Sequence, residues 1–409
     1  MSAPPPRKTP PAPCFHILDL GTSTLRLVQV RMAEGAMEYA AHLTAPSQGM
    51  RKGAVTGLAP AAEAMQALAA EMELRTGVPV ERVFLSLTGA QIKGLTSQGG
   101  LPLNSRSREV TREDARRVLD MARAMALPDD RQILHVIPQE FVLDRQGGIH
   151  EPVGMLASRL EARIYALTVA TSAKDNLVLA ANHAGLEVEE LIFAPLASAE
   201  ACLETEDRFA GVAMVELGAG TTGILVYSQG SLVHAASVAI GGDHFTNDIS
   251  ICLNTPVAEA ERLKLGYGAA TGALAGGDGV SIEVPGMHGQ PSRLLPRRQL
   301  CECIEPRARE LTRLIAKELA TVPGLAAGIL MSGGGQRLQG LPEMLAEASG
   351  LAVRSAVPSL IEGMPQELAE PEFAFMVGAC FYAHRLMSRR QRAPGWWEKL
   401  RARLNDLAD

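Results

Sequence analysis

A turn of glycine and hydroxyl residues that begins two positions after an acidic residue occurs once in each half of this chain. The first copy reads DLGTST and contains Asp19, Gly21, Thr22 and Ser23. The second copy reads ELGAGTTG and contains Glu216, Gly218, Gly220, Thr221 and Thr222. Apolar, β-favouring runs flank both copies, so each copy predicts a β-hairpin whose first strand ends in the acid. Recurrence of this hairpin predicts two related α/β lobes.

The chemistry of these turns suits a phosphate group and a metal ion. A carboxylate at the end of a strand can hold Mg²⁺ through water, so Asp19 and Glu216 are candidate metal residues. Backbone N–H groups of a glycine turn can surround phosphate oxygens. Two such turns that face each other would hold a triphosphate between them. Many hairpins have turns of this kind, so two unrelated tight turns are the alternative interpretation.

A third glycine cluster consists of Gly333, Gly334 and Gly335. It follows the apolar run 329–332 and precedes a helical pattern. Glycines allow a backbone to approach a flat ligand closely. We therefore expect contacts with a nucleotide base or ribose here, and a plain loop is the alternative.

The remaining pattern predicts several helices and one irregular region. Apolar periodicity predicts helices over 58–75, 299–320 and 373–387. Thr111 and Asp114 predict a capping box at the start of a helix over 112–126. Residues 132–144 should form an extended pair around Pro138, and 266–291 should be irregular.

Composition restricts the class of protein. The chain has 409 residues, which predicts two to four packed units, and its net charge of −6 argues against a nucleic-acid surface. No stretch reaches the roughly 20 apolar residues of a transmembrane span. The Pro-rich segment 1–13 lacks the apolar core of a secretory signal, so we expect a disordered tail. Six cysteines without a C-x-x-C pair predict reduced, partly buried thiols rather than a zinc site.

The motifs DLGTST, ELGAGTTG and SGGGQRLQGL resemble, in this order, the phosphate-1, phosphate-2 and adenosine motifs of the actin fold. Actin, MreB, DnaK-type chaperones and sugar kinases share that fold. Further segments resemble the cell-division family FtsA: QILHVIPQEF at 132–141, PVGM at 152–155, LEVEELIFAPLASAEACL at 186–203, TNDI at 246–249, AEAERLK at 258–264 and CIEPRARE at 303–310. HVIPQE belongs to the subdomain that FtsA inserts, so it is more specific than the phosphate turns. The resemblance covers about 14–388 and the terminal helix.

The resemblance implies a two-lobed α/β fold of the actin type, with an FtsA-type insert and ATP in the central cleft. Glu261 and Lys264 match positions that contact ribose and base. Gly241, Gly242 and Thr246 match the loop that closes over the nucleotide. The implied units are a tail at 1–13, subdomain 1A at 14–87 and 166–208, inserted subdomain 1C at 88–165, subdomain 2A at 209–249 and 326–388 (its last helix packing on 1A), subdomain 2B at 250–325, a linker at 389–395 and a membrane helix at 396–409.

Three positions depart from the pattern of the family. Glu216 stands where an Asp is usual, and Gly223 replaces an Asp at the end of the same motif. Ala194, before Pro195, stands where related ATPases place a water-orienting Glu. Loss of a general base removes roughly 10²–10⁴-fold in rate. We expect ATP to bind and to be hydrolysed slowly or not at all.

The last segment predicts an amphipathic helix. Its apolar side contains Trp396, Trp397, Leu400, Leu404 and Leu407. Tryptophans suit the headgroup layer of a membrane, and the arginines of the preceding linker suit an anionic leaflet. FtsA proteins also end in such a helix. The alternative is a helix that packs on the protein or on a partner.

The resemblance also implies partners and a location. FtsZ would bind, through its C-terminal tail peptide, to the subdomain that contains 250–320. Arg307 is the first candidate contact, and Arg297 and Arg298 are further candidates; a solvated helix face is the alternative. The protein would assemble with itself at the division site, peripherally on the cytoplasmic face of the inner membrane, and recruit other division proteins. Alternative functions are a PilM-type pilus-assembly adaptor and an actin-fold ATPase or kinase.

Overall fold

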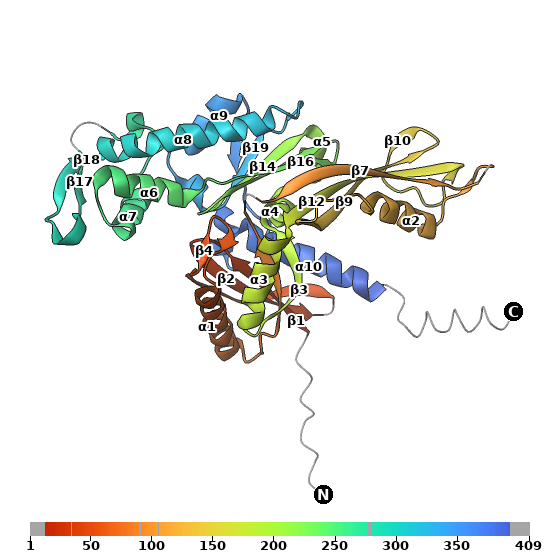
Figure 1. Ribbon diagram of the computed structural model, residues 1–409, viewed down its shortest axis with the longest axis horizontal. Helices are drawn as coiled ribbons and strands as arrows, with labels where there is room; N and C mark the ends of the chain where they lie inside the picture. The colour runs from red at the N-terminus through yellow and green to blue at the C-terminus, as the bar shows by residue number, and fades with distance from the viewer. Residues whose placement is uncertain (1–12, 34, 90, 105, 277–279, 393–409) are drawn as a thin grey trace, which may run out of the picture.

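Two five-stranded sheets with the same strand order form the centre of the molecule (Figure 1). The computed structural model describes residues 13–33, 35–89, 91–104, 106–276 and 280–392. The first sheet has the order β13-β6-β1-β2-β3, with strands Glu187–Phe193, Arg82–Leu87, Cys14–Leu20, Thr24–Ala33 and Ala36–Pro46. The second has the order β20-β19-β14-β15-β16, with strands Val353–Ser355, Ile329–Ser332, Val212–Leu217, Thr222–Ser228 and Ser231–Val238.

Each sheet joins an antiparallel meander to two parallel strands. In the first sheet β1 pairs with β2 and β2 with β3 in antiparallel fashion, while β6 runs parallel to β1 and to β13. The second sheet repeats this pattern with β14, β15, β16, β19 and β20. The repeat confirms the prediction of two related α/β lobes.

Alternation along the strands divides the core of the first lobe between two faces. Leu18, Leu25 and Leu27 pack with α1 (Leu58–Thr76), close to α3 (Thr171–His183). The side chains between them, such as Ile17 and Val28, point to the other face of the sheet and pack with α10 (Ala374–Arg392). The chain therefore returns to the first lobe after it has built the second.

Helix α10 crosses α4 (Ala194–Cys202) at very short range. A Cβ on Gly378 would lie 1.8 Å from the carbonyl oxygen of Ala197, so only glycine fits there. The prediction placed the start of a linker at 389, whereas α10 continues to Arg392. Arg and Gln favour helix, and the first strong helix breaker in the sequence is Pro394. The predicted amphipathic helix at 396–409 and the tail at 1–12 lie outside the described residues.

The insert is a separate four-stranded sheet of order β10-β9-β12-β7, with strands Gln146–Ile149, Arg131–Leu143, Arg159–Ala170 and Lys93–Pro102. Helix α2 (Arg112–Arg123) covers it and begins with the predicted capping box between Thr111 and Asp114. The expected pair of strands around Pro138 is wrong. Strand β9 is continuous, and a shift in its register with β12 leaves Gln139 unpaired beside the proline, which has no N–H to donate.

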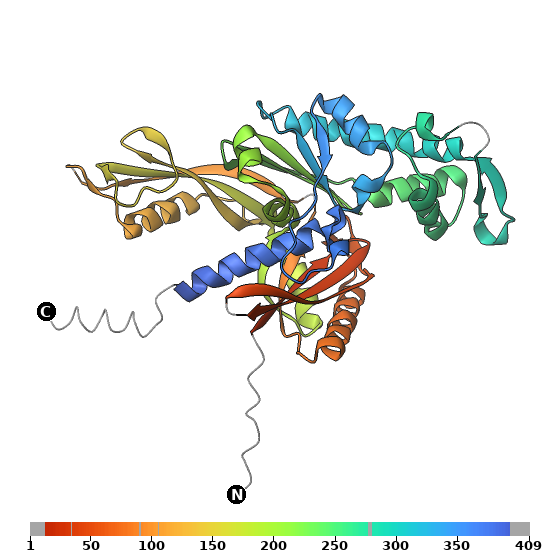
Figure 2. The same cartoon turned by 180° about the vertical axis from the view of Figure 1, so that it is seen from behind.

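The other end of the molecule consists of α6 (Gly242–Leu253), α7 (Val257–Tyr267), α8 (Arg297–Leu319) and α9 (Leu341–Ser349). This end and the insert extend in opposite directions from the central sheets (Figure 2). The region 266–291, predicted to be irregular, contains β17 (Ser281–Val284), which pairs with β18 (Arg293–Pro296). The short elements are α5 (Thr205–Ala210), β4 (Met50–Arg51), β5 (Ala54–Val55), β8 (Arg108–Glu109) and β11 (Leu156–Ala157).

No helix in the described part of the chain is long and apolar enough to cross a membrane.

A disulfide joins Cys252 on α6 to Cys303 on α8, with their Cα atoms 6.1 Å apart. The prediction that all cysteines are reduced thiols is wrong for this pair. One helical turn away, Asp248 on α6 forms an ion pair with Arg307 on α8. The two helices therefore lie side by side and run in opposite directions. The spacing of the cysteines in the sequence does not indicate this contact, because the two helices are far apart in the chain.

The disulfide predicts a reductant-dependent stability. It closes a loop of 51 residues, which in the chain-entropy model stabilises the fold by about 4 kcal/mol. We expect dithiothreitol to lower the free energy of unfolding by up to that amount, measured by urea titration. Alkylation of the denatured, unreduced protein should label four of the six cysteines. In the Cys252→Ser variant Cys303 should react, and the reductant should have no effect; labelling of all cysteines without reductant would contradict the disulfide.

A buried histidine connects the insert to the first lobe. His135 on β9 accepts a hydrogen bond at Nε2 from the backbone N–H of Phe193, at 3.0 Å. Its Nδ1 lies 3.3 Å from the hydroxyl oxygen of Tyr382 on α10. Burial lowers the pKa of His135 to about 4. Three segments of the chain therefore meet at one neutral imidazole.

This histidine predicts a loss of stability in mild acid. The pKa of His135 is about 4 in the folded protein and about 6.5 when unfolded. Below pH 6.5 the unfolded chain takes up the proton first, so stability falls as the pH drops toward 4. Between pH 6.5 and pH 5 this contribution is about 2 kcal/mol, from about 1.36 kcal/mol per pH unit. The His135→Gln variant keeps an acceptor, and its urea-unfolding free energy should lose about 2 kcal/mol less over that range. His183→Gln, on an exposed part of α3, is the control; equal losses in the unaltered protein and the His135→Gln variant would contradict the prediction.

Candidate functional site

A cleft of about 450 Å³ lies between the two lobes, where the two acidic turns meet. This volume is in the range of small-molecule sites. Of the candidate residues, the cleft is lined by Asp19, Gly21, Thr22, Ser23, Glu216, Gly218, Gly220, Thr221, Gly242, Glu261, Lys264, Gly333, Gly334 and Gly335. The fold thus brings together residues from three segments that are far apart in the sequence.

Three candidate residues do not line this cleft. Thr222 is fully buried, and its hydroxyl donates a 2.7 Å hydrogen bond to the carbonyl of Ile240. Gly241 supports the second turn, because a Cβ there would lie 2.4 Å from the carbonyl oxygen of Ala219. Thr246 lines an adjoining cavity of about 630 Å³. The structure therefore gives Thr222 and Gly241 packing roles.

The two acidic turns have the same backbone geometry. The N–H of Gly21 donates to the carbonyl of Thr24 at 3.1 Å, and the N–H of Gly218 donates to the carbonyl of Thr221 at 3.0 Å. A Cβ on Gly21 would lie 2.7 Å from the same carbonyl oxygen of Thr24. The glycine after each acid permits a tight hairpin that leaves the carboxylate at the mouth of the turn.

The side chain of Asp19 is buried in the cleft, and that of Glu216 is partly buried there. Burial raises the pKa of both groups, that of Glu216 to about 7. The hydroxyl of Ser198 on α4 donates to Glu216, and Arg26 Nη1 lies 3.4 Å from Asp19 Oδ2. The negative charge of Asp19 raises the pKa of Glu216 further. Two carboxylates with Arg26 as their nearby cation would suit a hard metal ion such as Mg²⁺, which prefers oxygen ligands.

The departures from the family pattern have structural consequences. A Cβ on Gly223 would lie 2.3 Å from Cγ of Pro195, so an acidic side chain has no room there. Ala194 is buried in an apolar cluster with Phe84 and Ile192 and does not line the cleft. Neither position supplies a carboxylate that could orient water.

The far end of the cleft has a lysine with three oxygen partners. Lys264 Nζ lies 2.7 Å from Glu261 Oε2, 2.9 Å from Thr246 Oγ1 and 3.1 Å from the carbonyl oxygen of Gly242. The three glycines complete this end of the site. Gly333, at φ +82°, and Gly335 pack closely against Leu217, whereas a Cβ on Gly334 would only reach ordinary contact with Glu372 Oε2, at 3.8 Å. Part of the triple-glycine pattern is therefore explained by packing.

A chain of charged residues in the cleft was missed from the sequence. Arg26 lies 3.7 Å from Glu372, and Glu372 lies 3.3 Å from Arg337, in the 3-10 helix Gly334–Arg337. Arg26 is the direct partner of Asp19 in the β1–β2 register. Counting that register from the turn would have found Arg26, but no sequence signal places Glu372 there.

The three arginines expected on the partner surface make contacts within the chain. Arg307 forms ion pairs with Asp248 and Glu310, and Arg298 pairs with Glu302. Arg297 donates to the carbonyls of Tyr267 and Leu274 and to Gln339, so it holds a loop against α8.

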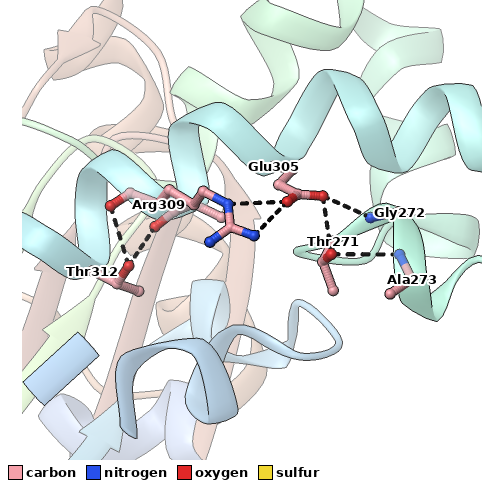
Figure 3. A network of polar contacts seen from close by, with 7 residues as sticks. Thr271, Gly272, Ala273, Glu305, Arg309 and Thr312 are labelled. Carbon is pink, nitrogen blue, oxygen red and sulfur yellow. Dashed lines mark hydrogen bonds and ion pairs between the residues drawn. The ribbon is translucent and has the colours of Figure 1, made fainter. Parts of the chain in front are cut away.

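A neighbouring network anchors the same loop (Figure 3). Glu305 on α8 accepts hydrogen bonds from the Thr271 hydroxyl and the Gly272 N–H, both at 2.9 Å, and pairs with Arg309. These contacts, led by that with Gly272, lower the pKa of Glu305. The outer face of α8 is therefore an ordered array of charges.

Comparison with known proteins identifies the family. A family model described as "Cell division protein FtsA" matches residues 213–378, and one described as "SHS2 domain inserted in FTSA" matches residues 89–168. The cell division protein FtsA of Pseudomonas aeruginosa is 36% identical, over 89% of this chain and 88% of the relative. The chain belongs to the FtsA family. That of Escherichia coli K12 is 34% identical, over 89% of each chain.

Solved structures agree on an actin-like fold. A chain of the PilM-PilN type IV pilus biogenesis complex matches with a TM-score of 0.63 and 18% identity, over 90% of this chain and 98% of that one. MreB5 of Spiroplasma citri bound to ADP matches with a TM-score of 0.55 and 13% identity, over 93% and 99%. At these identities the likeness concerns the fold alone.

The contact between the lobes at Gly220 predicts a steric variant. A Cβ on Gly220 would lie 2.4 Å from Thr22 Oγ1 and 2.8 Å from Lys52 Cα, both in the other lobe. We expect Gly220→Ala to destabilise the protein by about 1–3 kcal/mol, the range for overpacking. Thermal and urea unfolding measure this. Gly266→Ala on α7, where a Cβ meets nothing within 4 Å, is the control and should be neutral or stabilising; equal stability of both variants would mean that the lobes are not in contact there.

Proposed function

We propose that this chain is an ATP-binding, actin-like cell division protein that assembles with itself on the cytoplasmic face of the inner membrane. There it anchors FtsZ and recruits other division proteins to the division site. The observation that carries the proposal is the cleft of an FtsA-family chain, in which two equivalent turns present buried carboxylates to each other. An anionic ligand with its cation would satisfy both the carboxylates and the N–H groups of the turns.

The residues of the cleft have separate roles in this proposal. Asp19 and Glu216 would hold Mg²⁺ through water, and Mg²⁺ supplies neutralisation of the phosphate charge. The glycine turns would surround the phosphates, while Glu261, Lys264 and Gly334 would contact the ribose and base. Because positions 194 and 223 offer no carboxylate, we propose that the nucleotide orders the cleft and is hydrolysed slowly or not at all.

Membrane attachment is proposed for residues 396–409, which lie outside the described part. Their pattern places two tryptophans and three leucines on one side of a helix. A helix of this length binds a membrane weakly by itself, because affinity follows the buried apolar area. Self-assembly would add avidity to many weak anchors. Assembly and attachment would then reinforce each other.

The division role is favoured over the two alternatives by particular observations. A PilM-type adaptor shares the fold at 18% identity, whereas the insert matches the model of the FtsA insert. A kinase or ATPase would require a catalytic base, and Gly223 and Ala194 argue against one at the two expected positions.

The proposal predicts that this protein carries FtsZ to vesicles. With phosphatidylglycerol vesicles and ATP, the full chain should sediment with the vesicles and bring FtsZ with it. The chain without residues 396–409 should leave both proteins in the supernatant, because its apolar anchor is gone. FtsZ without its C-terminal tail should stay in the supernatant in either case.

Arg307 gives this experiment a matched pair of variants. Arg307→Glu should weaken FtsZ recruitment by about tenfold or more, since charge-assisted hydrogen bonds contribute about 1.5–3 kcal/mol. Arg313→Glu, at an exposed position on the same helix, should have no such effect. Equal sedimentation of the full and the truncated chain would rule out the anchor, and unchanged recruitment by Arg307→Glu would rule out this contact.

A further inference from the structure

A short hairpin of the first lobe touches both acidic turns. It consists of β4 (Met50–Arg51) and β5 (Ala54–Val55), joined by Lys52 and Gly53. The N–H of Gly53 donates a 3.1 Å hydrogen bond to Thr22 Oγ1 in the first turn. Lys52 Cα approaches Gly220 of the second turn so closely that a side chain at 220 would collide with it. The hairpin therefore closes one end of the contact between the lobes.

This hairpin brings two cations to cavities beside the cleft. Among the residues that the structure describes, neither Arg51 nor Lys52 has a carboxylate within 4.0 Å. Both line a cavity of about 220 Å³ and the adjoining cavity of about 630 Å³. Lys52, at φ +52°, and Gly53, at φ +72°, form the two-residue turn of this hairpin, in which both positions need a positive φ. Cations that line a cavity without a carboxylate partner are able to bind an anion.

The groups that face these cations suit an anion. The Ser47 hydroxyl is buried and has no hydrogen-bond partner among the described residues, and Ser47 lines the 630 Å³ cavity together with Thr22 and Ser23. Helix α6 begins at this cavity, and the positive end of a helix dipole favours a phosphate. Asp243 and Glu261 also line this cavity. Burial lowers the pKa of His244, and the charge of Lys52 lowers it further, so Lys52 faces the start of α6.

The position of the hairpin along the cleft identifies which part of a nucleotide it would meet. The 630 Å³ cavity shares Thr22, Ser23, Gly220, Asp243 and Glu261 with the central cleft, whereas residues 333–335 line the central cleft and not this cavity. The hairpin touches the two turns directly, at Thr22 and at Gly220, and this contact places it beside the phosphate end of the cleft. A diphosphate held by the turns would end short of it, and a third phosphate would extend toward it.

We propose that Arg51 and Lys52 form a subsite for the terminal phosphate of a nucleoside triphosphate. Through it the hairpin of the first lobe, the second turn and the start of α6 are joined by one ligand group. This inference rests on the proposed nucleotide binding and adds a means by which the site distinguishes a triphosphate from a diphosphate. With a diphosphate bound, the two cations stay unpaired and the contact between the lobes depends on packing at Gly220.

The test is a comparison of triphosphate and diphosphate affinity in charge variants. Lys52→Gln and Arg51→Gln should each bind a non-hydrolysable ATP analogue with Mg²⁺ about ten- to a hundredfold more weakly, the range for charge-assisted hydrogen bonds. Their affinity for ADP should stay within about twofold of the unaltered protein, because ADP does not reach the subsite. Isothermal titration calorimetry of the full chain measures both. Lys52→Arg keeps the positive charge and should therefore bind the ATP analogue about as tightly as the unaltered protein does. A merely structural role for the lysine side chain would not predict this recovery.

Controls separate this inference from the function on which it rests. Arg31→Gln removes an exposed cation of the same lobe and should change neither affinity. If the unaltered protein binds neither nucleotide, the proposed nucleotide site is wrong. If it binds both and the hairpin variants lose ATP and ADP affinity equally, or lose neither, the terminal-phosphate subsite is wrong. Melting temperatures of the variants, expected to match that of the unaltered protein, exclude a folding defect.

Discussion

The burial of two carboxyl groups at the junction of the lobes is the constraint around which the molecule is built. Burying a charge without a partner is costly, and this cost is offset by Arg26 and Ser86 beside Asp19, by the Ser198 hydroxyl beside Glu216, and by raised pKa values of both acids. Each acid is presented by a hairpin whose glycine permits a tight turn, and each hairpin is the first pair of strands in its sheet. The fold thus keeps two acidic groups close together, where a pair of apolar side chains would have been more stable. Such a costly arrangement is expected of a binding site.

The parts of the structure that the sequence predicted are those decided by nearby residues. The two hairpins follow from an acid, a glycine and flanking apolar runs, and the Thr111–Asp114 box follows from the preference of helix ends for oxygen acceptors. The parts that were missed are decided by tertiary contact. Three such contacts join segments that are far apart in the chain. They are the close approach of Gly223 to Pro195, the ion pair of Glu372 with Arg26 in the cleft, and the Cys252–Cys303 disulfide. The β17–β18 hairpin was missed because its strands are only four residues long and weakly patterned.

The two halves of the molecule have the same strand order but different surroundings for their acids. Asp19 has a cation as its cross-strand partner, whereas the cross-strand partner of Glu216 is Gly223. The longer side chain of Glu216 extends away from that empty position to Ser198 on α4. Helix α4 in turn packs against α10, so one hydrogen bond connects the cleft to the helix that leads out of the globular part. Glu216, in place of the usual Asp, thus links the cleft to α4 through Ser198.

The close crossing of α4 and α10 at Gly378 has a mechanical meaning. The last described helix belongs to the first lobe by contact, although the chain reaches it through the second. A pull applied at the end of α10 would act as shear along two helices whose backbones nearly touch, and not as tension across the cleft. The end of α10 therefore moves as one body with the first lobe.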